Sequence, residues 1–304
     1  MTVQASSSSS VPGYRVSVVI PTLNEARNLP HVLARLPLDV YEVIVVDGHS
    51  VDDTLAVARR LRPDVRIVMQ TRKGKGNALA CGFAAATGDI IAMVDADGSA
   101  DPGEIPRFVK ALVDGADFAK GTRFADGGGS SDITRLRTMG NRALSAFVNL
   151  CYGTRYTDLC YGFNAFWQRH VSVLALDATA PAPPGDGRLW GDGFEVETLI
   201  HIRVADAGLA VTEVPSFEHS RIHGVSNLSA FSDGLRVLRT ILAERRRSSQ
   251  AARRRAIAAS TELSEIEAGA LGALDADPAW SALVGPAVGH QWASPENLAQ
   301  GTAE

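Results

Sequence analysis

The chain has little cysteine and no long hydrophobic run, and both absences narrow its class. The three cysteines, Cys81, Cys151 and Cys160, have no Cys-x-x-Cys spacing, which argues against a disulfide framework or a zinc site. No uninterrupted apolar stretch approaches the roughly 18 residues of a membrane-spanning helix. The Ser-rich residues 1–10 lack the basic-then-apolar pattern of a signal peptide. We therefore expect a cytoplasmic protein with reduced thiols, soluble or peripheral at the cytoplasmic membrane face.

Basic residues are missing from the C-terminal part of the chain. Residues 261–304 carry seven acidic side chains and no Lys or Arg. Because the whole chain has a formal net charge of −4, residues 1–260 are left with +3. A mildly basic body suits an anionic substrate. The arginine clusters lack interleaved aromatic residues, so we expect no nucleic-acid partner.

Composition and periodicity divide the chain into four expected parts. These are a disordered leader (1–13), a main α/β domain (14–227), an amphipathic basic helix (228–258) and an acidic, weakly structured tail (259–304).

One apolar stripe marks the expected basic helix. It consists of residues at helical spacing, namely Leu228, Phe231, Leu235, Leu238 and Leu242. The stripe either packs into the core or lies on an anionic membrane, with residues 245–247 and 253–255, all arginine, against the headgroups.

Short β-branched runs alternate with helical patterns along the main domain. Expected strands cover 16–20, 42–46, 65–69, 90–94, 116–119 and 210–214, and expected helices cover 25–36, 53–61, 75–86, 133–150 and 193–207. The glycine-rich segment 127–131 is expected to be a mobile loop. The alternation predicts a mostly parallel sheet with helices on both faces. Ligands of such sheets bind beyond the carboxyl ends of the strands, where Pro21, Asp47 and Asp95 lie.

Two carboxylates directly follow the apolar run 90–94. Asp95 and Asp97 are two residues apart, so they lie on the same side of an extended chain. They can offer oxygen ligands to a hard cation such as Mg²⁺ or Mn²⁺. Mg²⁺ commonly binds one or two protein carboxylates and completes its shell with phosphate oxygens. The pair therefore predicts a metal-bound diphosphate and a nucleotide substrate.

Four ordered segments resemble the motifs of family 2 glycosyltransferases, which have the GT-A fold, a Rossmann-like mostly parallel sheet flanked by helices. The segments are Val18-Val19-Ile20-Pro21-Thr22-Leu23-Asn24-Glu25, the run from Val45 to Thr54, Gly74-Lys75-Gly76-Asn77-Ala78-Leu79 and Asp95-Ala96-Asp97. Residues 120–240 are similar to the dolichyl- or polyprenyl-phosphate sugar synthases of that family. The chain departs from these patterns at Asp47-Gly48-His49-Ser50, where the family often has Asp-Asp-Gly-Ser. It also departs at Ser99 and Asn227, where the synthases often have Gln and Lys.

The resemblance implies an inverting transfer of a hexose from a nucleoside-diphosphate sugar, of the GDP-mannose or UDP-glucose type, to polyprenyl or dolichyl phosphate. Asp95 and Asp97 would hold the metal, which neutralises charge on the leaving diphosphate. The donor would contact Pro21, Leu23, Glu25, Asp47, Lys75 and Ala96. Arg123 would reach the diphosphate, and the catalytic Arg221 and the acceptor-binding His223 would lie in a loop that closes over the donor or the acceptor. Arg135 and Arg137 would bind the acceptor phosphate. Asp158 is expected to be structural.

Several alternatives stay open. A hydroxyl acceptor, on a small molecule or a polysaccharide, would need a general base, with Glu195 ahead of Asp192 and Glu197, whereas a phosphate acceptor is already anionic. A sugar nucleotidyltransferase would be expected to carry a glycine-rich basic loop where this chain has Pro21 to Glu25. The intact Asp95 and Asp97 disfavour a non-catalytic nucleotide-sugar-binding protein. Donor identity, a homo-oligomer and a membrane-embedded partner are all undecided.

Overall fold

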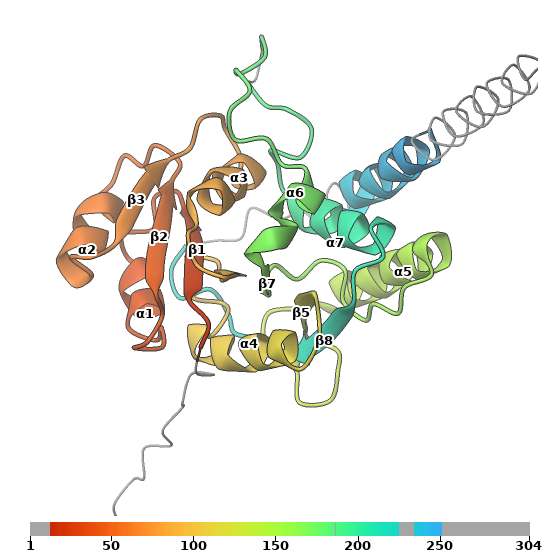
Figure 1. Cartoon of the computed structure of the whole chain (residues 1–304), viewed down its shortest axis with the longest axis horizontal. Coiled ribbons are helices and arrows are strands. Elements are labelled where there is room, and N and C mark those ends of the chain that lie inside the picture. The colour runs from red at the N-terminus through yellow and green to blue at the C-terminus, as the bar shows by residue number, and fades with distance from the viewer. Residues whose placement is uncertain (1–12, 186, 225–233, 251–304) are drawn as a thin grey trace, which may run out of the picture. The chain divides into compact units, whose positions relative to one another are not determined.

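Residues 13–185, 187–224 and 234–250 are described in the computed structural model of the chain (Figure 1). Contacts divide the chain into two units, Met1–Arg246 and Arg247–Glu304. The sheet, its helices and the candidate site all belong to the first unit. The expected leader, except for Gly13, and the expected tail lie outside the described residues.

Seven strands form one mixed sheet in the order β3-β2-β1-β4-β7-β5-β8. They are β1 (Val16–Thr22), β2 (Glu42–Asp47), β3 (Arg66–Met69), β4 (Ile90–Met93), β5 (Phe118–Thr122), β7 (Asn164–Trp167) and β8 (Val211–Pro215). β7 runs antiparallel to both of its neighbours, and all other pairs are parallel. The predicted mostly parallel α/β fold is confirmed, but the central antiparallel strand was not predicted.

Helices cover both faces of this sheet because alternate strand residues point to opposite sides. Val18 and Ile20 of β1 face α1 (Leu29–Leu33), α2 (Thr54–Leu61) and α4 (Ile105–Val113). Val19 faces the other layer, made of α3 (Lys75–Ala85), α6 (Val171–Leu174) and α7 (Val196–Asp206). Short 3₁₀ turns, Pro102–Glu104 and Gln168–His170, lead into α4 and α6. Both faces are therefore buried, as a mostly parallel sheet requires.

A third cluster extends the core beyond α7. Ile202 of α7 packs with Val148 of α5 (Arg135–Tyr152) and with Val237 and Ile241, which lie on a helical stretch over residues 234–246. In Figure 1 this stretch, the start of the blue helix, lies beside α7. α7 is covered by the sheet on one side and by these helices on the other, so its residues Val196–Val204 are buried all round.

Two members of the apolar stripe expected in 228–242 lie outward rather than in the core. Leu235 and Leu242 are 45% and 44% exposed, whereas their neighbours Val237 and Ile241 are buried. Leu238 is half-buried, and Leu228 and Phe231 lie outside the described residues.

Two local predictions also need correction. The helix expected over 25–36 is limited to α1, because residues 25–28 form a turn closed by the Asn28 N–H on the Glu25 carbonyl (3.0 Å) and Pro30 starts the helix. The expected mobile loop 127–131 contains β6 (Gly129–Ser130), which pairs with β9 (Phe217–Glu218).

None of the helices in the described part of the chain combines the length and apolar character that crossing a bilayer requires.

Candidate active site

A cavity of about 1170 Å³ opens at the carboxyl ends of the strands. Eleven of the predicted site residues line it, namely Pro21, Leu23, Glu25, Lys75, Asp95, Ala96, Asp97, Arg123, Arg137, Arg221 and His223. Asp47, Arg135 and Glu195 do not line it. The loops after β1 and β4, the start of α3 and the segment after β9 thus meet at one place, as parallel strands favour.

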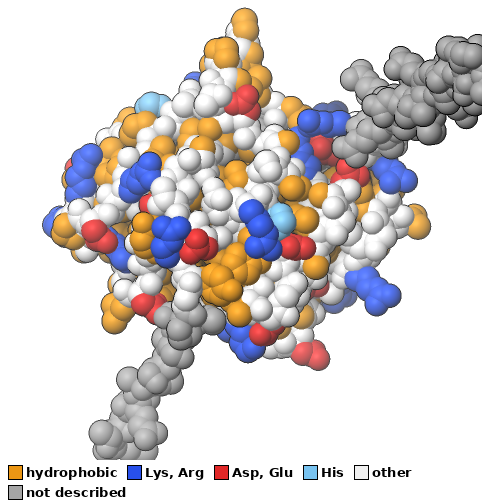
Figure 2. Space-filling view, viewed as in Figure 1, with side chains coloured by type: hydrophobic (Ala, Val, Ile, Leu, Met, Phe, Trp, Pro, Cys, Tyr) orange, Lys and Arg blue, Asp and Glu red, His pale blue; other side chains and the backbone are white. Residues whose placement is uncertain are grey.

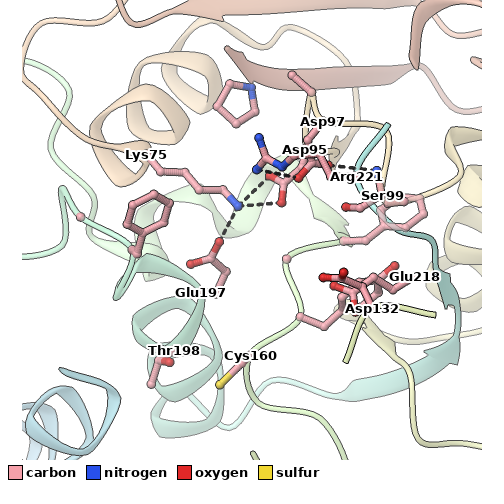
Figure 3. Close-up of a pocket in the computed structure, with 18 of the residues that line it drawn as sticks. Lys75, Asp95, Asp97, Ser99, Asp132, Cys160, Glu197, Thr198, Glu218 and Arg221 are labelled. Carbon is pink, nitrogen blue, oxygen red and sulfur yellow. Dashed lines mark hydrogen bonds and ion pairs between the residues drawn. The ribbon is translucent and has the colours of Figure 1, made fainter. Parts of the chain in front are cut away.

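Lys75 bridges two carboxylates at the centre of the cavity (Figure 3). Its Nζ lies 2.6 Å from Asp95 Oδ1 and 2.5 Å from Glu197 Oε1. Burial alone would lower the pKa of Lys75, but the two carboxylates outweigh it and raise that pKa. Burial also raises the pKa of Glu197, and the charge of Asp95 adds to this, while Lys75 opposes it. One ammonium between two carboxylates leaves a net negative charge, which suits an added cation.

Arg221 forms ion pairs with both Asp97 and Glu25, which lies in the loop after β1. Its guanidinium lies 3.0 Å from Asp97 Oδ2 and 3.4 Å from Glu25 Oε1. Burial raises the pKa of Glu25, although a hydrogen bond from Asn28 Nδ2 and the charge of Arg221 oppose the rise. The arrangement links Asp97 with a residue that the sequence assigned to the donor.

The segment carrying Arg221 lies directly against the metal motif. The Ile222 N–H donates to the Asp97 carbonyl (3.3 Å), and the His219 N–H donates to the Ser99 carbonyl (2.7 Å). Gly98, at φ +76°, allows this approach, since a Cβ there would lie 2.6 Å from Ile222 Cδ1. The segment therefore covers one side of the cavity.

His223 extends this cover to the loop after β1. Its carbonyl accepts a hydrogen bond from Asn28 Nδ2 (3.1 Å), and its Nδ1 lies 3.2 Å from an Arg27 Nη2. Arg27 and Asn28 also line the cavity, although sequence analysis assigned neither to the site. These contacts place His223 at the loop after β1.

Arg123 forms ion pairs with two acidic side chains, Asp158 and Glu218. Asp158 accepts from its Nε (2.7 Å) and Nη2 (2.9 Å), and Glu218 lies 3.0 Å from its Nη1. Burial would lower the pKa of Arg123, but these carboxylates raise it overall. Asp158 is fully buried, in keeping with the structural role expected for it. Glu218 also lines the cavity, but sequence analysis did not assign it to the site. Its place beside Arg123 depends on the pairing of β9 with β6, which joins segments remote in the sequence.

The start of α3 is packed against the segment before α7. A Cβ on Gly76 would lie 1.7 Å from the Gly191 carbonyl oxygen, and Gly74 has φ +120°. Asp192 fixes this segment, because its carboxylate accepts from Arg72 Nε (2.8 Å) and Nη2 (2.9 Å) in a pair only 5% and 1% exposed. Asp192 therefore has a structural partner rather than the general-base position considered for it.

Glu195 and Glu197 lie on different sides of the start of α7. The Glu195 carboxylate accepts hydrogen bonds from the Gly191 and Gly193 N–H groups. Glu197 instead faces Lys75 inside the cavity. The acid that reaches the cavity is thus Glu197, although Glu195 was the first candidate from the sequence.

Asp47 lies buried just outside the cavity. Its Oδ2 accepts from the Ser50 N–H (2.8 Å), while its Oδ1 is buried without a partner among the described residues. A buried carboxylate oxygen without a donor is costly. This oxygen is suited to accept from a donor group brought by a ligand.

The two predicted acceptor arginines on α5 diverge. Arg137 lines the cavity, with its Nη1 3.5 Å from Asp132 Oδ2, whereas Arg135 is exposed outside it. Residues two apart on a helix point to different sides.

The carboxylates of Asp95 and Asp97 suit a cation whose remaining ligands are diphosphate oxygens. Among the described residues, no group of three or more His, Cys, Asp or Glu side chains is placed to hold a metal. Asp95 and Asp97 supply oxygen ligands beside the cavity, with side chains 33% and 16% exposed. Two carboxylates with ligand phosphates completing the shell is the arrangement Mg²⁺ favours.

Comparison with known proteins agrees with this geometry. Residues 17–174 match the family described as glycosyl transferase family 2. An undecaprenyl-phosphate mannosyltransferase of Micrococcus luteus is 34% identical over 224 residues, which cover 71% of this chain and 88% of that protein. A polyprenol monophosphomannose synthase of Mycolicibacterium smegmatis is 31% identical over 228 residues, covering 72% and 82%. An uncharacterized glycosyltransferase of Mycobacterium tuberculosis is 46% identical over 111 residues, and the match spans 50% of its length.

Solved structures give the same class. The glucosyl-3-phosphoglycerate synthase of Mycobacterium tuberculosis, crystallised with Mn²⁺, UDP and glucosyl-3-phosphoglycerate, superposes with a TM-score of 0.57 at 27% identity, covering 76% of this chain and 80% of that one. Another structure of that enzyme contains Mg²⁺ and UDP. The fold and the site define a glycosyltransferase with the GT-A fold. The chain belongs to glycosyltransferase family 2, which confirms the expected family and enzyme class.

Proposed function

We propose that the protein transfers a hexose from a nucleoside-diphosphate sugar to a polyprenyl phosphate, with Mg²⁺ or Mn²⁺ held by Asp95 and Asp97. The observation that carries the acceptor is the lining of the cavity. Besides Asp95 and Asp97, it includes apolar residues of α5 and of the stretch 234–238, namely Leu136, Ala143, Leu144, Leu235 and Leu238. We call these five residues the apolar end of the cavity. A prenyl chain suits that end, and two relatives are named for polyprenyl-phosphate acceptors.

The ion pairs of the cavity also favour an acceptor that is already ionised. Each acid in the following pairs has a cationic partner: Glu25 and Asp97 with Arg221, Asp95 and Glu197 with Lys75, Glu218 with Arg123, and Asp132 with Arg137. A phosphate nucleophile is already ionised and needs no base, so none of these acids has to leave its cation to take a proton. Arg137 lines the cavity on the same helix as Leu136, Ala143 and Leu144, and we assign it to the acceptor phosphate.

The residues divide the work of the reaction. When bound, the metal stabilises negative charge on the leaving diphosphate. Lys75, at the start of α3, can transfer its contact from Glu197 to that diphosphate. Asp47 and Glu25 position the nucleoside. Arg221 holds the segment 219–224 over the donor side and so limits access of water.

A hydroxyl acceptor is the second candidate. It is favoured by the likeness to glucosyl-3-phosphoglycerate synthase. In that case Glu197, once released from Lys75, would be the base, and its raised pKa would help it take a proton.

A transfer assay separates the two functions. The protein is incubated with Mn²⁺ or Mg²⁺, a panel of radiolabelled GDP- and UDP-sugars, and either polyprenyl phosphate or 3-phosphoglycerate. We expect label in the organic phase from one donor, dependent on metal and lost in Asp97→Asn, which preserves the side-chain shape. Chelation with EDTA should abolish transfer in the same way.

The contrary results are equally clear. Label found only in the aqueous 3-phosphoglycerate product would replace the lipid acceptor by a hydroxyl acceptor. Organic-phase label that persists in Asp97→Asn and in EDTA would remove the metal role of this pair.

A further inference from the structure

Helix α5 carries apolar side chains on its outward side in addition to the core-facing Val148. Leu136, Met139 and Leu150 are 69%, 69% and 84% exposed, whereas Asn141 and Ser145 are buried. Ala143 and Ala146 are also exposed and lie on the same side at 100° per residue. We name Leu136, Met139, Ala143, Ala146 and Leu150 the α5 outward face. A helix that only packs on a core has the opposite arrangement.

A second apolar stripe lies outward on residues 234–246. Leu235 and Leu242 are exposed, while the opposite side carries the buried Val237, Ile241 and Glu244. Arg239 and Arg246 are exposed and, by helical spacing, lie with Leu235 and Leu242.

Arginines also border the α5 outward face. Arg135 and Arg142 are exposed and, at 100° per residue, lie along one edge of that face beside Met139 and Ala146. Both apolar stripes therefore combine exposed hydrophobic side chains with cations and with no acidic residue at the positions named. This is the composition of helices that lie in the interface of an anionic membrane.

The two stripes border the apolar end of the same cavity. Leu136 of α5 and Leu235 of the second helix both line it, as do Asp95 and Asp97. A surface that met lipid here would bring the cavity to the membrane.

We propose that the α5 outward face, together with Leu235 and Leu242, seats the protein on an anionic membrane surface, so that a lipid-linked acceptor enters the cavity from the bilayer. The nature of what enters rests on the proposed function, but the docking does not. A second copy of the chain fits this surface less well, because it would bring the same arginines and no complementary charge at the positions named. Anionic headgroups complement them.

Vesicle sedimentation of the full chain tests the docking. Wild type is compared with Met139→Glu/Leu150→Glu on phosphatidylcholine vesicles with and without phosphatidylglycerol. Both positions are exposed and neither lines the cavity. We expect wild type to bind the anionic vesicles and the variant to bind at least about tenfold more weakly, because two inserted apolar side chains are lost. The matched control is Leu38→Glu/Leu61→Glu, which adds the same charge at exposed leucines near α1 and on α2, far from α5 in Figure 1.

Further outcomes separate this inference from the proposed function. Transfer to a short, water-soluble prenyl phosphate should be equal in wild type and in Met139→Glu/Leu150→Glu. Equal vesicle binding by wild type and that variant would overturn the docking, even with transfer intact. So would a wild-type dimer that the variant converts to a monomer without a change in vesicle binding. Failure of transfer to every prenyl phosphate, with vesicle binding retained, would overturn the proposed function instead.

Discussion

At the scale of single residues, the site depends on one ammonium shared by two carboxylates. Lys75 and Glu197 are 15% and 11% exposed in their side chains. Lys75→Met would leave Glu197 and Asp95 close together without a cation. Removing one partner of a buried pair typically costs about 3 kcal/mol or more. We therefore expect Lys75→Met to lower the free energy of unfolding by about 3 kcal/mol, measured by urea denaturation.

Lys110→Met is the matched control for that change. Lys110 lies 2.6 Å from Asp114, but the two side chains are 68% and 57% exposed. Surface pairs contribute about 1 kcal/mol or less. A loss from Lys75→Met as small as that from Lys110→Met would mean that the central cluster is solvated and does not hold the site together.

Most of the site residues predicted from the sequence line the cavity, but the pairing among them was not predicted. Motif residues such as Asp95 and Lys75 could be assigned because each stands at a strand or helix end. The choice between Glu195 and Glu197 could not be made, because it depends on where α7 begins. The helix starts at Val196, so Glu197 faces Lys75 while Glu195 binds backbone N–H groups outside it. A shift of a few residues in a predicted helix start reverses that choice.

At the scale of secondary-structure elements, the start of α3 must approach the Gly191 carbonyl closely. Gly76→Ala would place a Cβ 1.7 Å from that oxygen, and backbone cannot yield cheaply. We expect this variant to be destabilised by about 2 kcal/mol or more, within the range of overpacking changes. Thermal unfolding followed by circular dichroism measures the change.

Gly140→Ala, in α5, should have the opposite effect on stability from Gly76→Ala. A Cβ at Gly140, within α5, meets nothing within 4 Å. Alanine there should stabilise the protein by about 0.5–1 kcal/mol, because glycine is the poorer helix former. Destabilisation by both substitutions alike would show that close approach at Gly191 is not the cause of the Gly76 effect.

The elements found from the sequence are those with clear periodicity. β7 was missed because Asn164-Ala165-Phe166-Trp167 contains no β-branched residue, and its place between β4 and β5 is decided by pairing with strands remote in sequence. The segment that forms β6 was expected to be a mobile glycine loop for the same reason, since it pairs with β9, which is remote in the sequence. Long-range pairing overrides local composition at both places.

At the scale of the whole molecule, one sheet joins an N-terminal parallel half to a C-terminal half through β7. Figure 2 shows that cationic and anionic side chains are interspersed over the face drawn, so neither sign dominates there. Buried groups whose pKa values are shifted make the stability depend on pH. His201 of α7 is one of them, fully buried with its Nδ1 2.9 Å from the Leu159 carbonyl oxygen.

Burial, reinforced by repulsion from Lys120, lowers the pKa of His201 to about 3. In the unfolded chain the pKa of histidine is about 6.5, so the unfolded state binds more protons between these values. The stability that neutral His201 provides is complete above about pH 6.5 and is lost as the pH falls toward 3, with a slope of up to about 1.4 kcal/mol per pH unit. The substitution His201→Gln removes the titrating ring. The free energy of unfolding of this variant should therefore fall less steeply with acidification than that of the wild-type protein. Urea titrations between about pH 7 and pH 4 measure both slopes, with His31→Gln, an exposed histidine, as the control. Parallel curves for wild type and His201→Gln would show that His201 is not the group whose protonation opposes the fold.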